Sequence, residues 1–298
     1  MRILCFSLFF LAVAIVFGAA QNAQAQEPVK FQVGKITVWA IADAVADRDM
    51  SVFMADQETL QRYVPSGKTP SSVMTFVVQT EGETILIDTG YGREGATPPS
   101  LLMPGLTSIG INPQDISQVL ITHMHGDHIG GLIQKGAKAF PKAKIRIASQ
   151  EYSFWLSEKS RADFPDRKAN FDMVKRISDM YEGAISLFDF GESVAPGITA
   201  LDAVGHTPGH TAFMIESEGK RLLCVSDFLH AAALQFPRPD INARYDMDPD
   251  QARVSRERLL KLAADENLPI AGMHLPAPGI GYVRKATEGY AYHPEMKQ

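Results

Sequence analysis

Short apolar runs rich in β-branched residues recur along this chain, and segments of helical periodicity lie between some of them. The runs predict strands at residues 35–41, 73–79, 84–87, 118–121, 145–148, 198–204, 211–215, 221–225 and 269–271. Helical patterns predict helices near residues 150–158, 168–182 and 250–264. The strands outnumber the helices, so we expect an α/β fold of sheets covered by helices rather than an all-β sandwich.

Polar residues follow five of these predicted strands. Asp88, His123, His206, Asp227 and His274 each come just after an apolar run. Open α/β sheets place their ligand sites at the carboxyl ends of the strands. We therefore expect these five side chains to meet at one site.

The segment His123-Met-His125-Gly-Asp127-His128 packs four metal-ligating side chains into six residues. Imidazole and carboxylate suit zinc and similar divalent cations. In an extended segment His123 and His125 point the same way and can share one ion. Asp127 and His128 are adjacent, so at least one faces elsewhere, which indicates a second ion. The alternatives are one structural zinc or no metal, but structural zinc usually recruits cysteine, and Cys224 is the only cysteine near a candidate ligand.

The N-terminus has the features of a signal peptide. Met1-Arg2 precedes an uncharged apolar stretch at residues 3–20, and Ala23-Gln24-Ala25 fits a small-x-small cleavage site. We expect residues 1–25 to be removed and residues 26–298 to form one catalytic domain that is periplasmic or secreted. An uncleaved N-terminal anchor is the alternative.

Composition and the remaining motifs exclude several classes of function. A net charge of −5 offers no electrostatic footprint for nucleic acid. The chain has neither a Gly-rich loop ending in Lys-Ser/Thr nor a Gly-x-Ser-x-Gly elbow, which disfavours a nucleotide-binding loop and a serine hydrolase. We expect a small-molecule substrate, no nucleic-acid partner, and no membrane association once the signal peptide is removed.

Three further histidines have separate interpretations. His206 and His210 share the turn Gly-His-Thr-Pro-Gly-His, and His206, directly after the strand, is the better ligand. We expect His210 to lie behind the ligands. His230 follows Asp227 by three residues and could donate a hydrogen bond into the pocket, with an ordinary loop histidine as the alternative. His293 is expected at the surface.

Together, the His-x-His-x-Asp-His segment, the Gly-His-Thr-Pro-Gly-His turn, Asp227 and His274 resemble the metallo-β-lactamase fold. The resemblance implies an αββα sandwich with metals between the sheet edges. Residues 154–156, 227–240 and 274–281 are similar to the methyl parathion hydrolase group, and the similarity runs from about Phe31 to Arg284.

This resemblance also implies roles for individual residues. One metal would be held by His123, His125 and His206, the other by Asp127, His128 and His274, with Asp227 bridging the two ions and Asp88 orienting the cluster. Trp155 and Phe171 would belong to an aromatic wall that grips aryl groups. The loop at residues 90–95 lacks a phenylalanine expected in pesticide-degrading members, and Tyr91 would partly replace it. A homodimer is implied by the resemblance alone.

These features predict an exported dinuclear metal-dependent hydrolase. A hydroxide shared by two ions, which lower the pKa of water, would attack lactones or aryl esters, with phosphotriester hydrolysis as a weaker activity. Asp127, Asp227 and His230 are the candidate catalytic residues. Asp227 would position the bridging hydroxide, and His230 would help the leaving group depart. We expect Zn²⁺, with Mn²⁺, Co²⁺ and Fe²⁺ as alternatives.

Other functions remain open at this stage. An acyl-homoserine lactonase and a β-lactamase are alternatives, although β-lactamases of this fold generally lack a bridging carboxylate such as Asp227. A non-catalytic metal-binding protein is the alternative from a different class.

Overall fold

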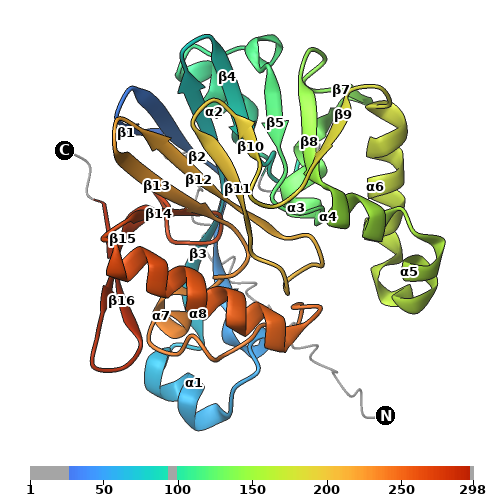
Figure 1. The fold of residues 1–298 in the computed structure, drawn as a ribbon. Coiled ribbons are helices and arrows are strands. Elements are labelled where there is room, and N and C mark those ends of the chain that lie inside the picture. Colours follow the sequence, from blue (N-terminus) through green and yellow to red (C-terminus); the bar gives the residue numbers. More distant parts are fainter. Residues whose placement is uncertain (1–26, 93–98, 296–298) are drawn as a thin grey trace, which may run out of the picture.

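Two seven-stranded sheets dominate the computed structural model, which describes residues 27–92 and 99–295 (Figure 1). The predicted signal peptide therefore lies outside the described residues, as do residues 93–95 of the loop at residues 90–95. In spatial order, the first sheet contains β1 (Val29–Val33), β2 (Ile36–Asp49), β3 (Lys68–Thr80), β4 (Glu83–Ile87), β5 (Gln118–Leu120), β8 (Lys144–Ala148) and β9 (Ile185–Phe188). The second contains β10 (Ser193–Ala195), β11 (Ile198–Asp202), β12 (Thr211–Ser217), β13 (Lys220–Val225), β14 (Pro269–Gly272), β15 (Ile280–Lys285) and β16 (Tyr290–Pro294).

The remaining elements are a small hairpin and the helices. The hairpin pairs β6 (Ile133–Gln134) with β7 (Ala137–Lys138). The α-helices are α1 (Gln57–Tyr63), α2 (Leu102–Ser108), α3 (Gly126–Ile129), α4 (Ser149–Trp155), α5 (Glu158–Asp163), α6 (Lys168–Met180), α7 (Ala232–Gln235) and α8 (Pro249–Asp265). Short 3₁₀ helices are η1 (Met50–Val52), η2 (Pro113–Asp115), η3 (Gly130–Leu132) and η4 (Pro165–Arg167).

Hydrophobic side chains fill three layers, because both faces of the central strands are buried. In β4, Ile85 and Ile87 lie in the core between the two sheets, while Leu86 joins the core on the outer face. In β13, Leu222 faces inward and Leu223 faces outward. This period of two is the pattern of strands buried on both sides.

Helices cover the two outer faces. Leu106 of α2 and Val174 of α6 belong to the core outside the first sheet, and Leu259 of α8 belongs to the core outside the second. Figure 1 shows α8 lying across the second sheet and α6 beside the strands of the first. The predicted αββα sandwich is confirmed.

Strand direction explains why the candidate site residues converge. β4 and β5 are parallel, and so are β13 and β14. β11 and β13 each run antiparallel to β12, so they run parallel to each other. The residues that follow β4 and β5 therefore leave the first sheet at the same end. Likewise, the residues that follow β11, β13 and β14 leave the second sheet at one common end.

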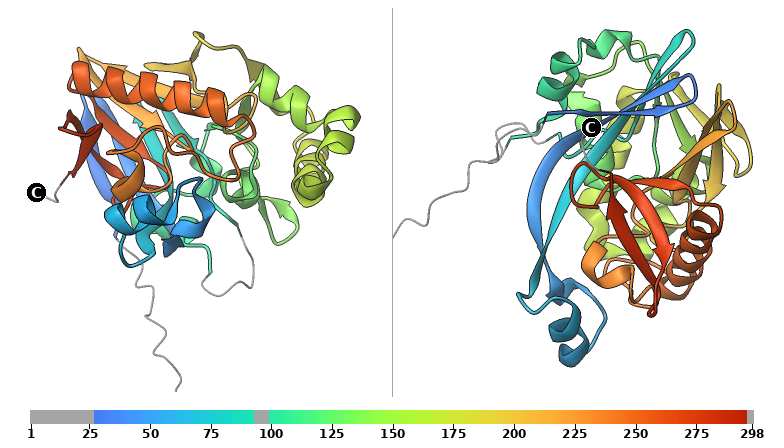
Figure 2. Two further views of the ribbon diagram at one scale, coloured as in Figure 1. Left: turned by 90° about the horizontal axis from the view of Figure 1, so that it is seen from below. Right: turned by 90° about the vertical axis from the view of Figure 1, so that its left-hand side faces the viewer.

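The β2–β3 pair extends beyond the rest of the first sheet. Its register runs from Thr37–Gln79 to Asp49–Lys68, with a bulge between Ala42 and Ala44. Figure 2 shows this ribbon reaching toward the region of α1. The extension carries Arg48 close to the ends of the second sheet, where it contacts His274.

The structure contains every strand and helix that the sequence predicts. The main sheets also contain strands that were not predicted, namely β9, β10 and β15 within them and β1 and β16 at the two ends of the described chain. In β1 and β16 the burial pattern is mostly half-buried or exposed, and apolar runs are weak. Among the described residues, no helix has the length and apolar character needed to cross a membrane.

Phe213 provides a test of the interface between the sheets. Its ring is fully buried and lies 6.1 Å, centroid to centroid, from that of Phe188 in the opposite sheet. We expect Phe213→Ala to lower the free energy of unfolding by about 3–5 kcal/mol, because it removes a buried ring and leaves a cavity. The control is Val254→Ala, on the exposed side of α8, where Val254 is 47% exposed. It should change the free energy of unfolding by less than about 0.5 kcal/mol. Denaturant unfolding measures both, and equal effects would contradict this packing.

Candidate metal centre

Seven predicted ligands meet where the two sheets end. The first sheet supplies His123 after β5, and His125, Asp127 and His128 at the start of α3. The second sheet supplies the other three, which are His206, Asp227 and His274.

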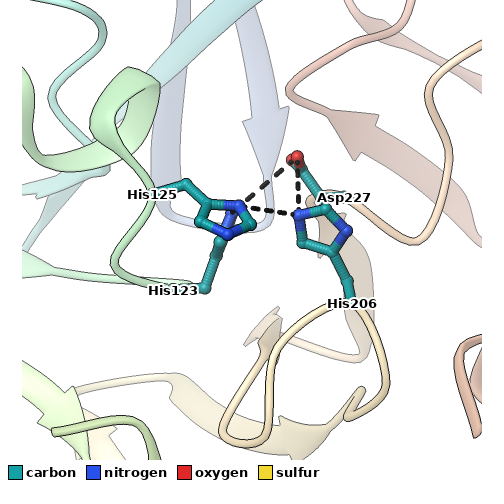
Figure 3. A group of neighbouring side chains, drawn as sticks. All are labelled: His123, His125, His206 and Asp227. Carbon is teal, nitrogen blue, oxygen red and sulfur yellow. Dashed lines mark hydrogen bonds and ion pairs between the residues drawn. The ribbon is translucent and has the colours of Figure 1, made fainter. Parts of the chain in front are cut away.

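One group of ligands is formed by His123, His125, His206 and Asp227 (Figure 3). His125 Nδ1 lies 3.0 Å from His123 Nε2 and 2.9 Å from His206 Nε2. Asp227 Oδ2 lies 3.3 Å from His206 Nε2. The nitrogen atoms that face one another are thus Nε2 of His123, Nε2 of His206 and Nδ1 of His125.

A second group is formed by Asp127, His128 and His274. Asp127 Oδ2 lies 3.7 Å from His128 Nε2 and 3.5 Å from His274 Nε2. Asp227 lies between the two groups, with Oδ1 3.2 Å from His128 Nε2 and Oδ2 3.2 Å from His274 Nε2. Asp227 therefore has the position of a bridging ligand.

The arrangement fits two cations better than it fits hydrogen bonding. Three imidazole nitrogens of the first group face one another with few protons to share, and the fully buried His128 Nε2 has no hydrogen-bond partner. Unpaired buried acceptors are costly, and a cation among them removes that cost. In each group, the potential ligand atoms lie within 4.8 Å of one another. The donor set, all imidazole and carboxylate, suits borderline divalent metals.

Hydrogen bonds on the far side of the rings fix their orientation. His128 Nδ1 lies 2.7 Å from Asp88 Oδ2, and His206 Nδ1 lies 2.9 Å from Asp246 Oδ1. His274 Nδ1 lies 2.8 Å from the Ser72 carbonyl oxygen. Each Nδ1 thus donates to an oxygen, which leaves Nε2 free to bind a metal.

Asp88 lies in the position predicted for it, behind the ligands. It is fully buried and has a positive φ of 56°, an uncommon conformation for a non-glycine residue. Its carboxylate accepts hydrogen bonds from the Thr122 amide at 2.8 Å and from the Thr122 hydroxyl at 2.6 Å. Asp88 therefore joins the end of β4 to the His-x-His-x-Asp-His segment.

The electrostatics of the site favour neutral rings at His123, His125 and His206 around an ionised Asp227, whereas at His128 the carboxylates of Asp227, Asp127 and Asp88 outweigh burial and raise the pKa. Burial lowers the pKa of His123, His125 and His206 well below the usual value. Burial opposes the charge on Asp227, yet the adjacent His274 and His128 lower the pKa of its carboxyl well below the usual range. Neutral imidazole and ionised carboxylate are the forms that bind metals.

His210 and His230 both contact Asp227. His210 Nε2 accepts a hydrogen bond from the Asp227 amide at 3.1 Å, while its Nδ1 faces the Ala203 carbonyl oxygen at 2.8 Å. His230 Nε2 lies 3.0 Å from Asp227 Oδ2, and its ring stacks on His274. Burial lowers the pKa of His230 to about 3, so the ring is neutral. A neutral His230 that donates from Nε2 to Asp227 holds this carboxylate in place, and its role toward the leaving group stays a prediction.

Glu151 ties together the two halves of the site, and the sequence gives no signal for this role. It is fully buried, and burial raises the pKa of its carboxyl. Oε1 accepts from the Met124 amide at 2.8 Å and from Trp155 Nε1 at 2.7 Å. Oε2 accepts from the Thr207 hydroxyl at 2.7 Å and from the Gly209 amide at 2.9 Å. One carboxylate thus connects the loop of His123 and His125 to the turn of His206.

A cavity of about 440 Å³ opens onto the metal centre. Its walls are lined mainly by polar and charged residues: Arg48, His125, Gly126, Asp127, Asp166, Arg167, Ala169, Asn170, Met173, His206, Asp227, His230, Tyr245 and His274. Arg48, Arg167 and Tyr245 come from segments where no motif marks them, so they were not predicted from the sequence.

The expected aromatic wall is not part of this lining. Trp155 and Phe171 are 1% and 2% exposed, belong to the core outside the first sheet, and lie 4.8 Å apart between ring centroids. The Trp155 ring also lies 5.6 Å from that of His125. Both are packing residues and not the substrate contacts that were predicted, because α4 and α6 turn these side chains inward to cover the sheet.

Comparisons with known proteins agree with this geometry. The family model for the metallo-beta-lactamase superfamily matches residues 69–274. An N-acyl homoserine lactonase of Bacillus cereus is 24% identical over 173 residues, which are 52% of this chain and 62% of that protein. The match therefore spans less than two thirds of that relative. The N-acyl homoserine lactonase AiiA of Bacillus thuringiensis subsp. kurstaki is 26% identical over 186 residues, covering 55% of this chain and 67% of AiiA.

Two solved structures are similar over most of the chain. The hydrolase AbOPH of the beta-lactamase superfamily has a TM-score of 0.84 and 26% identity, covering 92% of this chain and 99% of its own. AidC, described as a dizinc quorum-quenching lactonase, has a TM-score of 0.81 and 26% identity, covering 91% of this chain and 98% of its own.

Glu151→Gln tests the link between the two halves of the site. An amide offers one acceptor oxygen and two donors, so it cannot accept from all four groups that contact Glu151. We expect metal content to fall and hydrolytic activity to drop by about 10–100-fold, as for other residues that orient metal ligands. Metal analysis and kinetics measure the two effects. Glu158→Gln, at the exposed start of α5, is the control, and wild-type metal content in Glu151→Gln would contradict the role.

Proposed function

We propose, from the premise that this chain belongs to the metallo-beta-lactamase superfamily and is a metal-dependent hydrolase, that it hydrolyses lactones and aryl esters at two divalent metal ions. The observation that carries the proposal is the position of Asp227 between two groups of ligands, beside the unpaired His128 Nε2. The similarity to lactonases supports the choice of lactone substrates.

Seven residues would hold the ions, which we propose to be Zn²⁺. His123, His125 and His206 would hold one, and Asp127, His128 and His274 would hold the other, with Asp227 shared. When bound, two such ions polarise the substrate oxygen and lower the pKa of water.

Tyr245 is placed to donate a hydrogen bond to the substrate. Its hydroxyl oxygen accepts from Arg48 Nη1 at 2.8 Å, so the phenolic proton is free to point elsewhere. Burial raises the pKa of Tyr245, which keeps the hydroxyl protonated at neutral pH. Since Tyr245 lines the cavity beside His206 and His230, that proton can reach an oxygen of a bound ester or its developing negative charge.

We further propose a subgroup and a location for this chain. The similarity of residues 227–240 and 274–281 supports membership of the methyl-parathion-hydrolase-like group. The absence of Trp155 and Phe171 from the cavity lining favours lactones and esters over aryl phosphotriesters. The N-terminal sequence supports export to the periplasm or beyond, with cleavage after Ala25.

One substrate panel tests the function. The mature protein, beginning at Gln26, is assayed with dihydrocoumarin, an aryl ester, an acyl-homoserine lactone, methyl parathion and a β-lactam, with its metals quantified. We expect two metal ions per chain, turnover of the lactones and the ester, loss of activity with a chelator, and recovery with Zn²⁺. Turnover confined to the β-lactam, or none with any lactone or ester, would refute the proposal.

Asp227→Asn tests the bridging position. The amide cannot offer two anionic oxygens to the two groups of ligands, so we expect kcat for lactone hydrolysis to fall more than about a hundredfold, beyond the effect of changing a residue that only orients ligands. Metal content should fall from two ions toward one. The control is Asp265→Asn, a surface aspartate paired with Lys261 and Lys285. Unchanged turnover and two bound ions in Asp227→Asn would exclude a bridging role.

A further inference from the structure

Two arginines from distant segments converge on the cavity above the metal centre. Arg48 lies near the end of β2, and Arg167 is the last residue of η4. Both are held by Tyr245, since Arg48 Nη1 donates to its hydroxyl at 2.8 Å and Arg167 Nη2 donates to its carbonyl oxygen at 3.1 Å. Both side chains line the same cavity as His125 and His274.

Arg167 faces a nitrogen of His125 that cannot accept a hydrogen bond once a metal is bound. Nδ1 of His125 is the atom that faces His123 and His206, so Nε2 carries the proton in the ligand form. Arg167 Nη1 lies 3.2 Å from that Nε2. Two N–H donors then face each other at the cavity wall without an acceptor between them.

Arg48 has the same relation to His274. The Ser72 carbonyl oxygen lies 2.8 Å from His274 Nδ1 and requires that Nδ1 carry its proton. Arg48 Nη2 lies 3.2 Å from the same Nδ1 and so has no acceptor there. Among the described residues, each of the two guanidinium groups thus directs a terminal N–H at an imidazole nitrogen that already carries a proton in the metal-binding form.

The other charged groups of the cavity leave this cationic character in place. Asp127 and Asp227 face the metal ligands. Asp166 and Asp246 both act on the Arg167 guanidinium and favour its charged form, but Asp166 is solvent-exposed, and Asp246 is engaged by His206 and the Ala243 amide.

We propose, resting on the proposed hydrolase function, that the substrate carries a carboxylate in addition to the ester or lactone that is cleaved. The carboxylate binds Arg167 together with the Nε2–H of His125, and Arg48 adds positive charge across the cavity. A guanidinium group and a neighbouring N–H match the two oxygens of a carboxylate. In the reaction, the oxygen of water bonds to the acyl carbon and the acyl–oxygen bond breaks. One proton goes to the departing alcohol or phenol oxygen and the other to solvent, which leaves a new carboxylate and a free hydroxyl, and the recognised carboxylate is unchanged.

A matched pair of esters provides the kinetic test. The para-nitrophenyl monoester of succinic acid and para-nitrophenyl butyrate share a leaving group and chain length and differ in the terminal carboxylate. We expect wild-type protein to prefer the succinate ester in kcat/KM, and Arg167→Gln to reduce that preference about tenfold, as expected when a charge-assisted hydrogen bond is lost. Arg48→Gln should reduce it less, and Arg167→Lys, which keeps the charge, should retain part of it.

A binding measurement tests the site without turnover. Calorimetry on the zinc-loaded protein compares succinate with butyrate, which can both place one carboxylate at the metals. We expect succinate to bind more tightly to the wild type, and Arg167→Gln to abolish the difference. Arg253→Gln is the control, because Arg253 pairs with Glu257 on α8 and does not line the cavity.

The outcomes separate this proposal from the proposed function. If Arg167→Gln preserves both the ester preference and the succinate advantage, or if the wild type has neither, the carboxylate site is wrong while neutral-ester turnover still supports a hydrolase. If no ester is hydrolysed, the hydrolase proposal fails, and the succinate–butyrate comparison decides the carboxylate site on its own.

Discussion

The structure depends on burying many hydrogen-bond acceptors at one point. Imidazole nitrogens and the Asp227 carboxylate face one another within hydrogen-bond distance, in a place where water cannot satisfy all of them. Such a group is stable only with cations among its members and rigid support behind them. The support comes from Asp88, Asp246 and Glu151, three buried carboxylates that hold ligands or the loops carrying them. The sheets, in turn, place the ends of their strands so that these loops meet.

Much of this arrangement could be predicted from the sequence, for physical reasons. Strands buried on both faces have continuous apolar runs, such as residues 85–87 and 222–225, which stand out in any hydrophobicity pattern. The carboxyl ends of those runs are followed by histidine or aspartate, so the ligand set could be named before the fold was known. The bridging place of Asp227 came from family resemblance, and the contacts with both ligand groups agree with it.

The walls of the site could not be predicted in the same way. Trp155 and Phe171 lie on helices where aromatic side chains serve equally for packing or for binding, and only the orientation of α4 and α6 decides between them. Arg48 reaches the cavity because β2 continues past its bulge, a feature without a sequence signal. Glu151 resembles any acidic residue in the first turn of a helix until its four hydrogen bonds are seen. These residues owe their roles to tertiary contacts between distant segments.

The division of the ligands between the sheets has a consequence for how the protein matures. His125 and His206 are 81 positions apart along the chain, and each half of the sandwich supplies only part of either ligand group. Contacts between such distant segments form late in folding, because closing a long loop costs conformational entropy before the contacts can stabilise the chain. Neither half alone supplies either of these two ligand groups in full, so full metal uptake requires that the two sheets have docked.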